Sequence, residues 1–306
     1  MALKDSLTFG MALPQRYPDA AAEPAVVRQV AQRAEALGFR DLWLTENTLD
    51  HVPCPDPLML LSHVAAVTSR IRLGVAVVVL PVHHPAHVAH QAATLDYLSG
   101  GRAVLGVGLG RDAHYGEFGV PVARRVRRFT EGLELMRALW TQEQVDYHGD
   151  IYQLHQAGML PKPVQQPLPV WFGGAHPDAI KRTAELADGW MGSGNSGRQA
   201  FVGHVQLLTE ALAAAGRAIA AFPISKRVFM SVHAQEAQAH TELRHYMDVV
   251  YRNGDLADRS GVWGTPQQVR ERLAELAVPG VNHLLLHPIC RPQEQLEALA
   301  EVVGLA

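Results

Sequence analysis

The sequence predicts a (β/α)₈ barrel, or TIM barrel, formed by a single domain over residues 1–306. Short apolar runs alternate along the chain with segments of helical periodicity, which is the pattern of a parallel sheet with crossover helices. Eight such strand and helix pairs follow one another, and barrels of about 250 residues form one domain. The composition, 48% hydrophobic and 19% charged, is that of an ordinary globular protein.

The eight expected strands are short runs rich in Val, Ile, Leu and aromatic residues. They are Leu7 to Ala12, Asp41 to Thr45, Ile71 to Val79, Arg102 to Val107, Pro169 to Phe172, Gly189 to Ser193, Arg227 to Val232 and Asn282 to His287.

A helix is expected after each strand. In the first, Val27, Val30, Ala31 and Ala34 recur at helical spacing, and Gly38 is a suitable C-cap. The others are Pro57 to Thr68, Pro85 to Leu98, Arg124 to Thr141, Asp178 to Ala187, Arg198 to Ala215, Pro266 to Ala277 and Gln293 to Val303.

Two stretches interrupt the repeat. Gln144 to Leu154 predicts a β-hairpin after the fourth helix, with a turn at His148-Gly149-Asp150. Ala234 to Trp263 predicts an extra helix and a Gly/Asp-rich loop after the seventh strand. Insertions of this kind usually cover the mouth of a barrel.

Charge and targeting signals narrow the class of protein. The formal net charge is −3, and basic residues cluster only at Arg124, Arg125, Arg127 and Arg128, which predicts a solvated helix end rather than a nucleic-acid or anion site. Cys54 and Cys290 are isolated, no signal peptide h-region is present, and no apolar run could span a bilayer. We therefore expect a cytoplasmic protein that binds neither nucleic acid nor membrane.

Function in a barrel is expected where the strands end at their carboxyl side. Gly173, Gly174, Ala175 and His176 follow the fifth strand, and Pro177 begins a helix. Backbone N–H groups at a helix N-terminus can bind phosphate, although a tight turn that only needs small residues would have the same sequence. A rival doubly wound fold is poorly supported, because the glycines at 106, 108 and 110 are followed by Arg111, where the dinucleotide fingerprint needs another glycine.

Other chemistries find little support in the sequence. His87 and His90 share a helix face, but no further ligand accompanies them, so no metal site and no metal-dependent barrel hydrolase is expected. No nucleophile elbow is present. An acid/base pair of Glu46 and Asp50 has nothing to support it.

Several motifs taken together resemble the luciferase-like family of flavin- or deazaflavin-dependent oxidoreductases, the bacterial luciferase superfamily. The resemblance covers about residues 8–303 in order. It rests on Ala34 to Phe39 leading into Leu42 to Asn47, on Thr68 to Gly74, on the specific block Ala92 to Arg102, on Ala187 to Trp190, and on Trp263 to Val269.

The resemblance implies a cofactor ring at the barrel mouth, and it transfers the family's cofactor-binding positions to this chain. A bulged third strand with a non-prolyl cis peptide maps onto Ala76-Val77, and the phosphate loop maps onto Gly173, Gly174, Ala175 and His176. The remaining implied cofactor-binding positions are Glu46, Asn47, Gly108, Ser193 and Gly194.

Two departures concern the mechanism. Related deazaflavin-dependent dehydrogenases place Asp-His where this chain has Glu46-Asn47, and Glu where it has Arg111. An amide does not titrate in the working range, so Asn47 cannot be a general base. We expect Asn47 to hydrogen-bond the ring or substrate, and Arg111 or His114 to stabilise negative charge. Candidates to line the substrate pocket are His51, Arg111, His114, Tyr115, Trp263 and His287.

The sequence thus predicts an oxidoreductase that acts on a small organic molecule with coenzyme F420 and hydride transfer. An FMN-dependent monooxygenase that uses FMNH2 and oxygen is the alternative, and a non-catalytic flavin carrier is a further one. A separate flavin or F420 reductase is a possible partner, and the family resemblance favours a homodimer.

Overall fold

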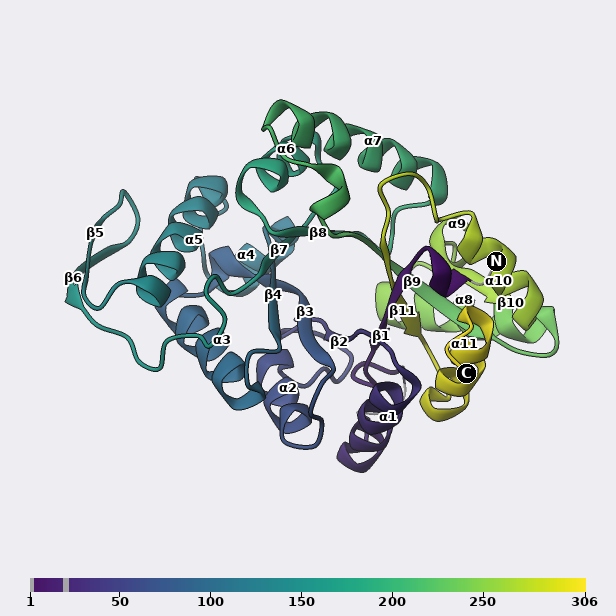
Figure 1. The fold of residues 1–306 in the computed structure, drawn as a ribbon. Coiled ribbons are helices and arrows are strands. Elements are labelled where there is room, and N and C mark those ends of the chain that lie inside the picture. Colours follow the sequence, from purple (N-terminus) through teal and green to yellow (C-terminus); the bar gives the residue numbers. More distant parts are fainter. Residues whose placement is uncertain (1–2, 19–21) are drawn as a thin grey trace.

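A closed parallel barrel forms the centre of the computed structural model, which describes residues 3–18 and 22–306 (Figure 1). Its strands follow the ring order β9-β11-β1-β2-β3-β4-β7-β8, and β8 pairs with β9 to close it. They are β1 Thr8–Ala12, β2 Asp41–Leu44, β3 Arg72–Val79, β4 Ala103–Gly108, β7 Val170–Gly173, β8 Gly189–Gly192, β9 Ile224–Val232 and β11 His283–Pro288. The predicted (β/α)₈ barrel is confirmed.

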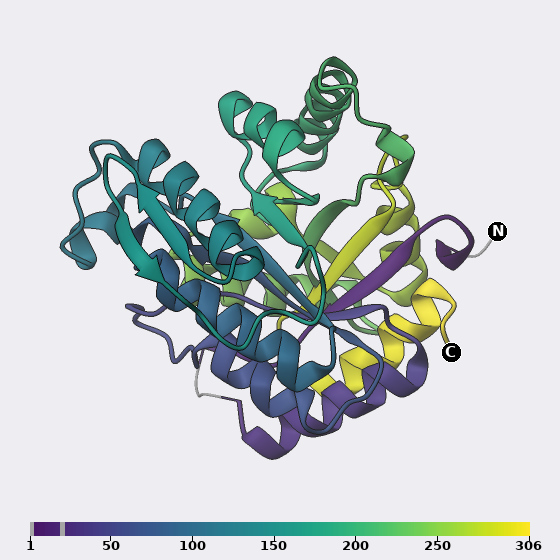
Figure 2. The same cartoon turned by 60° about the vertical axis from the view of Figure 1, so that its left-hand side comes forward.

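Helices surround the barrel and cover the outer face of its sheet (Figures 1 and 2). Most begin with proline at the first turn, where a missing N–H costs nothing. They are α1 Pro24–Leu37, α2 Pro57–Ala65, α3 Pro85–Ser99, α5 Arg125–Thr141, α6 Pro177–Leu186, α7 Arg198–Ala214, α10 Pro266–Ala274 and α11 Pro292–Val303. Within the described residues, no helix is both long and apolar enough to cross a membrane.

The predicted hairpin is present as β5 Val145–His148 and β6 Gln153–Ala157, and it lies on the outside of the molecule beside α5 (Figure 2). Its second strand starts two residues later than expected, because Ile151 and Tyr152 belong to the turn. There the buried carboxylate of Glu131 accepts hydrogen bonds from the backbone N–H groups of Asp150 and Ile151 at 3.0 and 2.9 Å.

The insertion after β9 contains more regular structure than the sequence predicts. The expected helix is α8 Glu236–Tyr251, but the expected loop holds α9 Leu256–Ser260 and β10 Val262–Gly264. A further short helix, α4 Asp112–Glu117, lies between β4 and α5, and three 3₁₀ turns complete the chain at Leu3–Asp5, Leu80–Val82 and Ile219–Ala221. These elements are too short to show a periodicity in the sequence.

Strand β9 differs from its neighbours in having three partners. Its first residues pair with β8 up to Gly192↔Lys226, and its last residues pair with β10 from Val262↔Met230. Arg227 is therefore the first residue of β9 beyond the β8 pairing. The barrel wall opens between β8 and β9 at this level.

The barrel interior is filled in layers. Trp43 and Trp171 pack with ring centroids 5.2 Å apart, and both are buried. Glycine gives them room, because a Cβ at Gly74 would lie 2.4 Å from the Trp43 ring and one at Gly189 would lie 2.6 Å from Trp171. Below them, a buried layer joins Ser225, His283 and Asp41.

Candidate functional site

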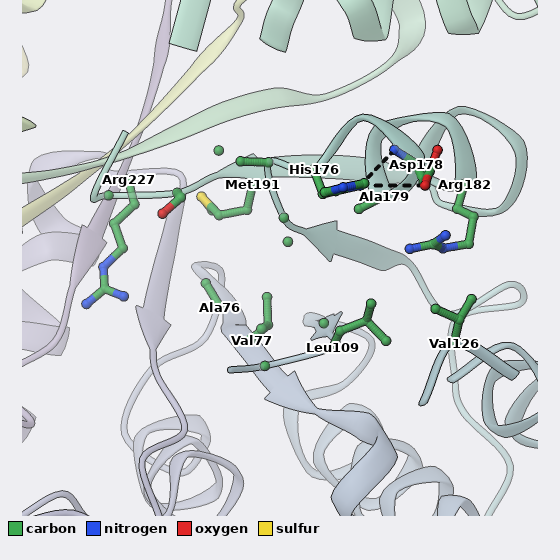
Figure 3. A pocket seen from close by; sticks show the side chains of 18 of the residues that line it. Ala76, Val77, Leu109, Val126, His176, Asp178, Ala179, Arg182, Met191 and Arg227 are labelled. Atoms are coloured by element: carbon green, nitrogen blue, oxygen red, sulfur yellow. Dashed lines mark hydrogen bonds and ion pairs between the residues drawn. The ribbon is translucent and has the colours of Figure 1, made fainter. Parts of the chain in front are cut away.

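A cavity of about 570 Å³ opens at the carboxyl ends of the strands (Figure 3). Nine predicted cofactor positions line it together with residues that the sequence analysis did not identify. The predicted nine are Ala76, Val77, Gly108, Gly173, Gly174, Ala175, His176, Ser193 and Gly194. The structure brings these residues together from four strand ends.

The floor of the cavity is a bulge in β3. The pairing of β3 with β4 shifts between Val75 and Val78, and the Ala76-Val77 peptide is cis, as the resemblance implied. The bulge directs the Val77 side chain onto the neighbouring strands β4 and β7. A Cβ at Gly108 would lie 2.8 Å from a methyl group of Val77, and a Cβ at Gly173 would lie 2.7 Å from the other. The two glycines are thus required by the packing of Val77.

Glu46 fixes the end of the bulged strand. Its carboxylate accepts a hydrogen bond from the backbone N–H of Val79 at 2.6 Å and lies 2.5 Å from Nε2 of His83. Burial opposes the ionisation of Glu46, but the bonds from His83 and Val79 outweigh it and lower its pKa. Glu46 does not line the large cavity, and its contacts are those of a residue that positions β3.

The N-terminus of α6 forms one end of the cavity. The N–H groups of Ala175 and His176 donate no hydrogen bond to any other part of the described chain. Nδ1 of His176 caps the helix by accepting from the N–H of Asp178 at 3.3 Å, and Trp190 Nε1 holds the carbonyl of Gly174 at 2.9 Å. This loop can hold an anion with backbone groups.

Arginines make the cavity positive. Arg125, Arg182 and Arg227 line it, and Asp178 is the one carboxylate among its described lining residues. Arg125 pairs with Asp112 outside the cavity, whereas Arg182 has neither an ion pair nor a hydrogen bond within residues 3–18 and 22–306. Arg125, one of the four arginines expected to form a solvated helix end, lies at the cavity because α5 begins beside it, and its charge is paired with Asp112.

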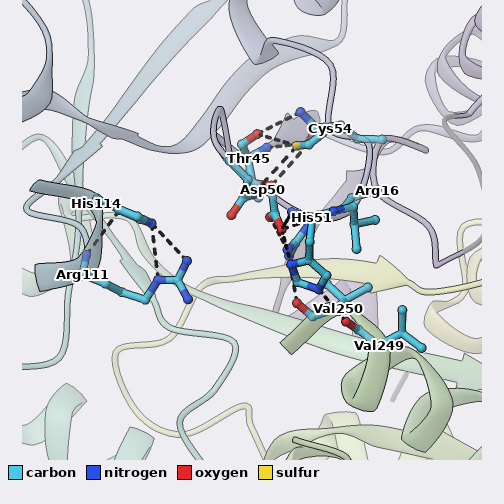
Figure 4. A network of polar contacts seen from close by, with 12 residues as sticks. Arg16, Thr45, Asp50, His51, Cys54, Arg111, His114, Val249 and Val250 are labelled. Atoms are coloured by element: carbon cyan, nitrogen blue, oxygen red, sulfur yellow. Dashed lines mark hydrogen bonds and ion pairs between the residues drawn. The ribbon is translucent and has the colours of Figure 1, made fainter. Parts of the chain in front are cut away.

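Three predicted catalytic residues lie elsewhere. Asn47, Arg111 and His114 line a separate small pocket with Glu46. Arg111 donates through Nε to Nε2 of His114 at 3.3 Å (Figure 4). Asn47 donates to the Thr45 hydroxyl at 3.1 Å. Burial and the Arg111 charge lower the pKa of His114, which favours the neutral imidazole. Their catalytic roles stay predictions.

The other substrate-pocket candidates are spread around the mouth. His51 contacts the carbonyl of Val249 at 2.8 Å and so joins the loop after β2 to α8 (Figure 4).

Tyr115 is buried, and its hydroxyl donates to the carbonyl of Leu109 at 2.6 Å. Because Leu109 lines the cavity, this hydrogen bond supports the cavity wall. Trp263 lies under the guanidinium of Arg272. Of these candidates, His287 is the one bonded to a charged cavity residue, Arg227.

The sequence analysis missed Arg182 and Arg227, the two cavity arginines that form no ion pair among the described residues. Arg182 follows Asp178 by four residues on α6, so the two side chains lie on the same helix face. That spacing could have identified Arg182 from the sequence as a residue near the phosphate loop. Arg227 was placed at the first residue of a strand, whereas β9 begins at Ile224 and carries Arg227 to the level of the cavity.

Comparison with known proteins agrees with this architecture. The family model for luciferase-like monooxygenases matches residues 7–261. An uncharacterised protein of Mycobacterium tuberculosis is 38% identical over 212 residues, which is 61% of this chain and 73% of that protein. An F420-dependent glucose-6-phosphate dehydrogenase of Kineococcus radiotolerans is 30% identical over 250 residues, 78% of this chain and 74% of that enzyme.

Among solved structures, an F420-dependent secondary alcohol dehydrogenase with an F420-acetone adduct superposes with a TM-score of 0.85 at 19% identity, covering 98% of this chain and 99% of that one. At this identity the likeness concerns the fold. The match of the family model shows that the chain belongs to the luciferase-like monooxygenase family, so it is an enzyme of the oxidoreductase and monooxygenase class.

Proposed function

We propose that the protein transfers hydride between coenzyme F420 and a small organic substrate. The observation that carries the cofactor site of this proposal is the shape and charge of the cavity. It runs from the α6 N-terminus, where two N–H groups and Arg182 have no partner among the described residues, to the bulge at Ala76-Val77. The name of the F420-dependent relative from Kineococcus radiotolerans supports the choice of cofactor.

The residues present fit a cofactor with a phosphate tail and a flat ring. The N–H groups of Ala175 and His176 and the guanidinium of Arg182 would hold the phosphate. Ala76 and Val77 would lie against the ring, and Met191 and Leu109 would exclude water from it. When bound, a deazaflavin supplies a hydride donor or acceptor, and the protein supplies orientation and a dry pocket.

An FMN-dependent monooxygenase is the second candidate, favoured by the description of the family model. The same loop would hold the FMN phosphate, so the charge of the site does not separate the two cofactors. Cytoplasmic location, a homodimer and a separate reductase as partner stay predictions, as does the alternative of a flavin carrier.

Binding of oxidised and reduced F420 and FMN to the purified protein, followed by ring fluorescence, tests the proposal. We expect F420 to bind more tightly than FMN and to be oxidised or reduced with a member of a panel of alcohols, imines and enoates. A preference for FMN would favour the monooxygenase, binding of neither would refute the cofactor assignment, and F420 binding without turnover would indicate a carrier.

Arg182→Gln tests the orientation of the cofactor. Losing a charged hydrogen bond to phosphate should weaken F420 binding by about 10- to 100-fold. Lys181→Gln is the matched control, because it removes the same charge from the exposed neighbour on α6, which does not line the cavity. Equal losses in both variants would contradict a specific phosphate contact.

A further inference from the structure

Arg227 lies at the end of the cavity away from the phosphate loop. Figure 3 shows it reaching in from β9, while Arg182 reaches in from α6, with Ala76, Val77 and Met191 between them. Arg227 is the first residue of β9 beyond its pairing with β8, so its side chain enters where the barrel wall opens.

The packing around Arg227 fixes its guanidinium. Its Nε donates to Nδ1 of His287 at 3.1 Å, and its Cζ lies 4.5 Å from the ring centroid of Phe229. Phe229 in turn packs against His287 at 4.8 Å. With Nε engaged and one face covered, the two terminal nitrogens of Arg227 have no partner in the described part of the chain.

His287 cannot serve as a counter-ion. Burial and the nearby guanidinium groups of Arg227 and Arg16 hold its pKa well below the ordinary value, so it is neutral and accepts from Arg227. Arg16 already pairs with Asp50. No carboxylate among residues 3–18 and 22–306 forms an ion pair with Arg227.

Two further polar groups of this region have no hydrogen-bond partner among the described residues. They are the buried hydroxyl of Tyr246, which is 1% exposed, and the buried Nε of Arg16. The Tyr246 ring lies 6.1 Å from Phe229, and the Arg16 guanidinium lies 5.4 Å from the ring of Tyr251, which also packs on Phe229. The region therefore has an excess of positive charge and of donors.

We propose that Arg227 binds a carboxylate group of the substrate, so that the enzyme acts on small organic acids. The planar fork of a guanidinium matches the two oxygens of a carboxylate, and its terminal nitrogens are the ones left free. The assignment of this end to the substrate rests on the proposed function, which places the cofactor phosphate at Arg182 and the ring at Ala76-Val77.

Matched acid and amide pairs test the proposal without knowledge of the natural substrate. Crotonate and crotonamide, benzoate and benzamide, and 3-phenylpropanoate and its amide are titrated by calorimetry into the protein, both free and loaded with its cofactor. We expect at least one acid to bind the wild type about tenfold or more tightly than its amide, and the preference to fall at high ionic strength.

Variants of Arg227 test whether this residue causes the preference for an acid over its amide. Arg227→Gln should bring the ratio of affinities to about one, and Arg227→Lys, which keeps the charge but not the fork, should give an intermediate ratio. Arg182→Gln, at the other end of the cavity, should keep the wild-type ratio. If Arg227→Gln does not fold, the Arg227→Lys ratio decides, and a ratio equal to that of the wild type overturns the proposal.

Three results would overturn it: no acid preferred over its amide, an acid preference that survives in Arg227→Gln, or an Arg227→Gln defect confined to the binding of reduced cofactor. Failure of the proposed function has a different signature. In that case F420 neither binds nor is turned over, while the acid preference of the free protein and its dependence on Arg227 persist.

Discussion

Two histidines on β11 differ in what surrounds them, although each bonds to the same neighbouring strand. His283 accepts from or donates to Ser225 of β9 at 2.6 Å, and His287 accepts from Arg227 of β9 at 3.1 Å. Both side chains lie inside the barrel, one layer above the other, since residues of a strand that differ by an even number share a face.

The lower pair is enclosed, and its two side chains bond to each other. His283 and Asp41 are each 1% exposed and lie 3.0 Å apart. Burial opposes the ionisation of Asp41, but His283 and the indole of Trp43 outweigh it and lower its pKa. Ser225, His283 and Asp41 thus repeat the order of contacts in a hydrolytic triad. Because no substrate can reach them, they serve stability.

The upper pair is open and has excess charge. Arg227 lines the cavity and is held by His287, and the guanidinium has no counter-ion in the described chain. The comparison shows that residue types and distances alone do not identify a site. Access and unmatched charge distinguish the binding layer from the structural one.

The largest expected effect comes from breaking the lower layer. His283→Leu leaves the Asp41 carboxylate buried without its main partner, so the free energy of unfolding should fall by about 3–5 kcal/mol. Urea unfolding measures this, with cofactor affinity measured on the folded fraction.

Ser225→Ala is the control, because it keeps the Asp41–His283 contact and should cost about 1 kcal/mol. Cofactor affinity should be unchanged in both variants. A stable His283→Leu protein that no longer binds cofactor would contradict the structural role of this layer.

A smaller effect is expected where packing and binding coincide. In Gly173→Ala the new methyl group would press on Val77, so we expect a loss of about 1–3 kcal/mol in unfolding free energy together with weaker cofactor binding. The double variant with Val77→Ala should recover much of the stability, since it removes the methyl groups that clash. No recovery in a double-variant cycle would show that the glycine serves another purpose.

A pH-dependent effect concerns Lys226, which separates the two layers on β9 and faces outward. Its Nζ donates to the carbonyls of Ser193 and Ser196 at 3.0 and 2.8 Å, and burial lowers its pKa to about 7. Between this value and the ordinary pKa near 10.5, the unfolded chain binds the proton and the folded chain does not. Stability should therefore rise with pH above about 7, by up to about 1.4 kcal/mol per pH unit.

Lys226→Met should remove this rise. Urea unfolding of both proteins at a series of pH values between neutral and alkaline measures the difference in slope. Parallel curves for the two proteins would mean that Lys226 stays charged in the fold.

The regular part of this fold was predictable from the sequence because its elements are long and periodic. Val27, Val30 and Ala34 mark α1, and the glycines at 173 and 174 mark the loop before α6. The short elements α9 and β10 were not predictable, because segments of three to five residues show no periodicity. β10 also depends on its pairing with β9, which is distant information for a sequence pattern.

The candidate site was predicted in its backbone and missed in its charges. Gly108, Gly173 and Ala76 lie where the resemblance placed them, since glycine and alanine report close packing directly. Arg227 could not be found, because its position depends on where β9 stops pairing with β8, which is a property of the closed barrel. Asn47 and His114 follow strand ends in the sequence yet turn into a separate pocket.

The pairing of β1 with β11 has a consequence for the order in which the chain is made. Thr8 of β1 aligns with His283 of β11. One edge of the first strand therefore stays unpaired until β11, the last strand of the chain, has been synthesised. Until then the nascent protein is an open sheet whose bare edges can recruit other chains. The distance along the chain also makes ring closure slow. Chaperone protection during synthesis should therefore matter most until the final strand has paired.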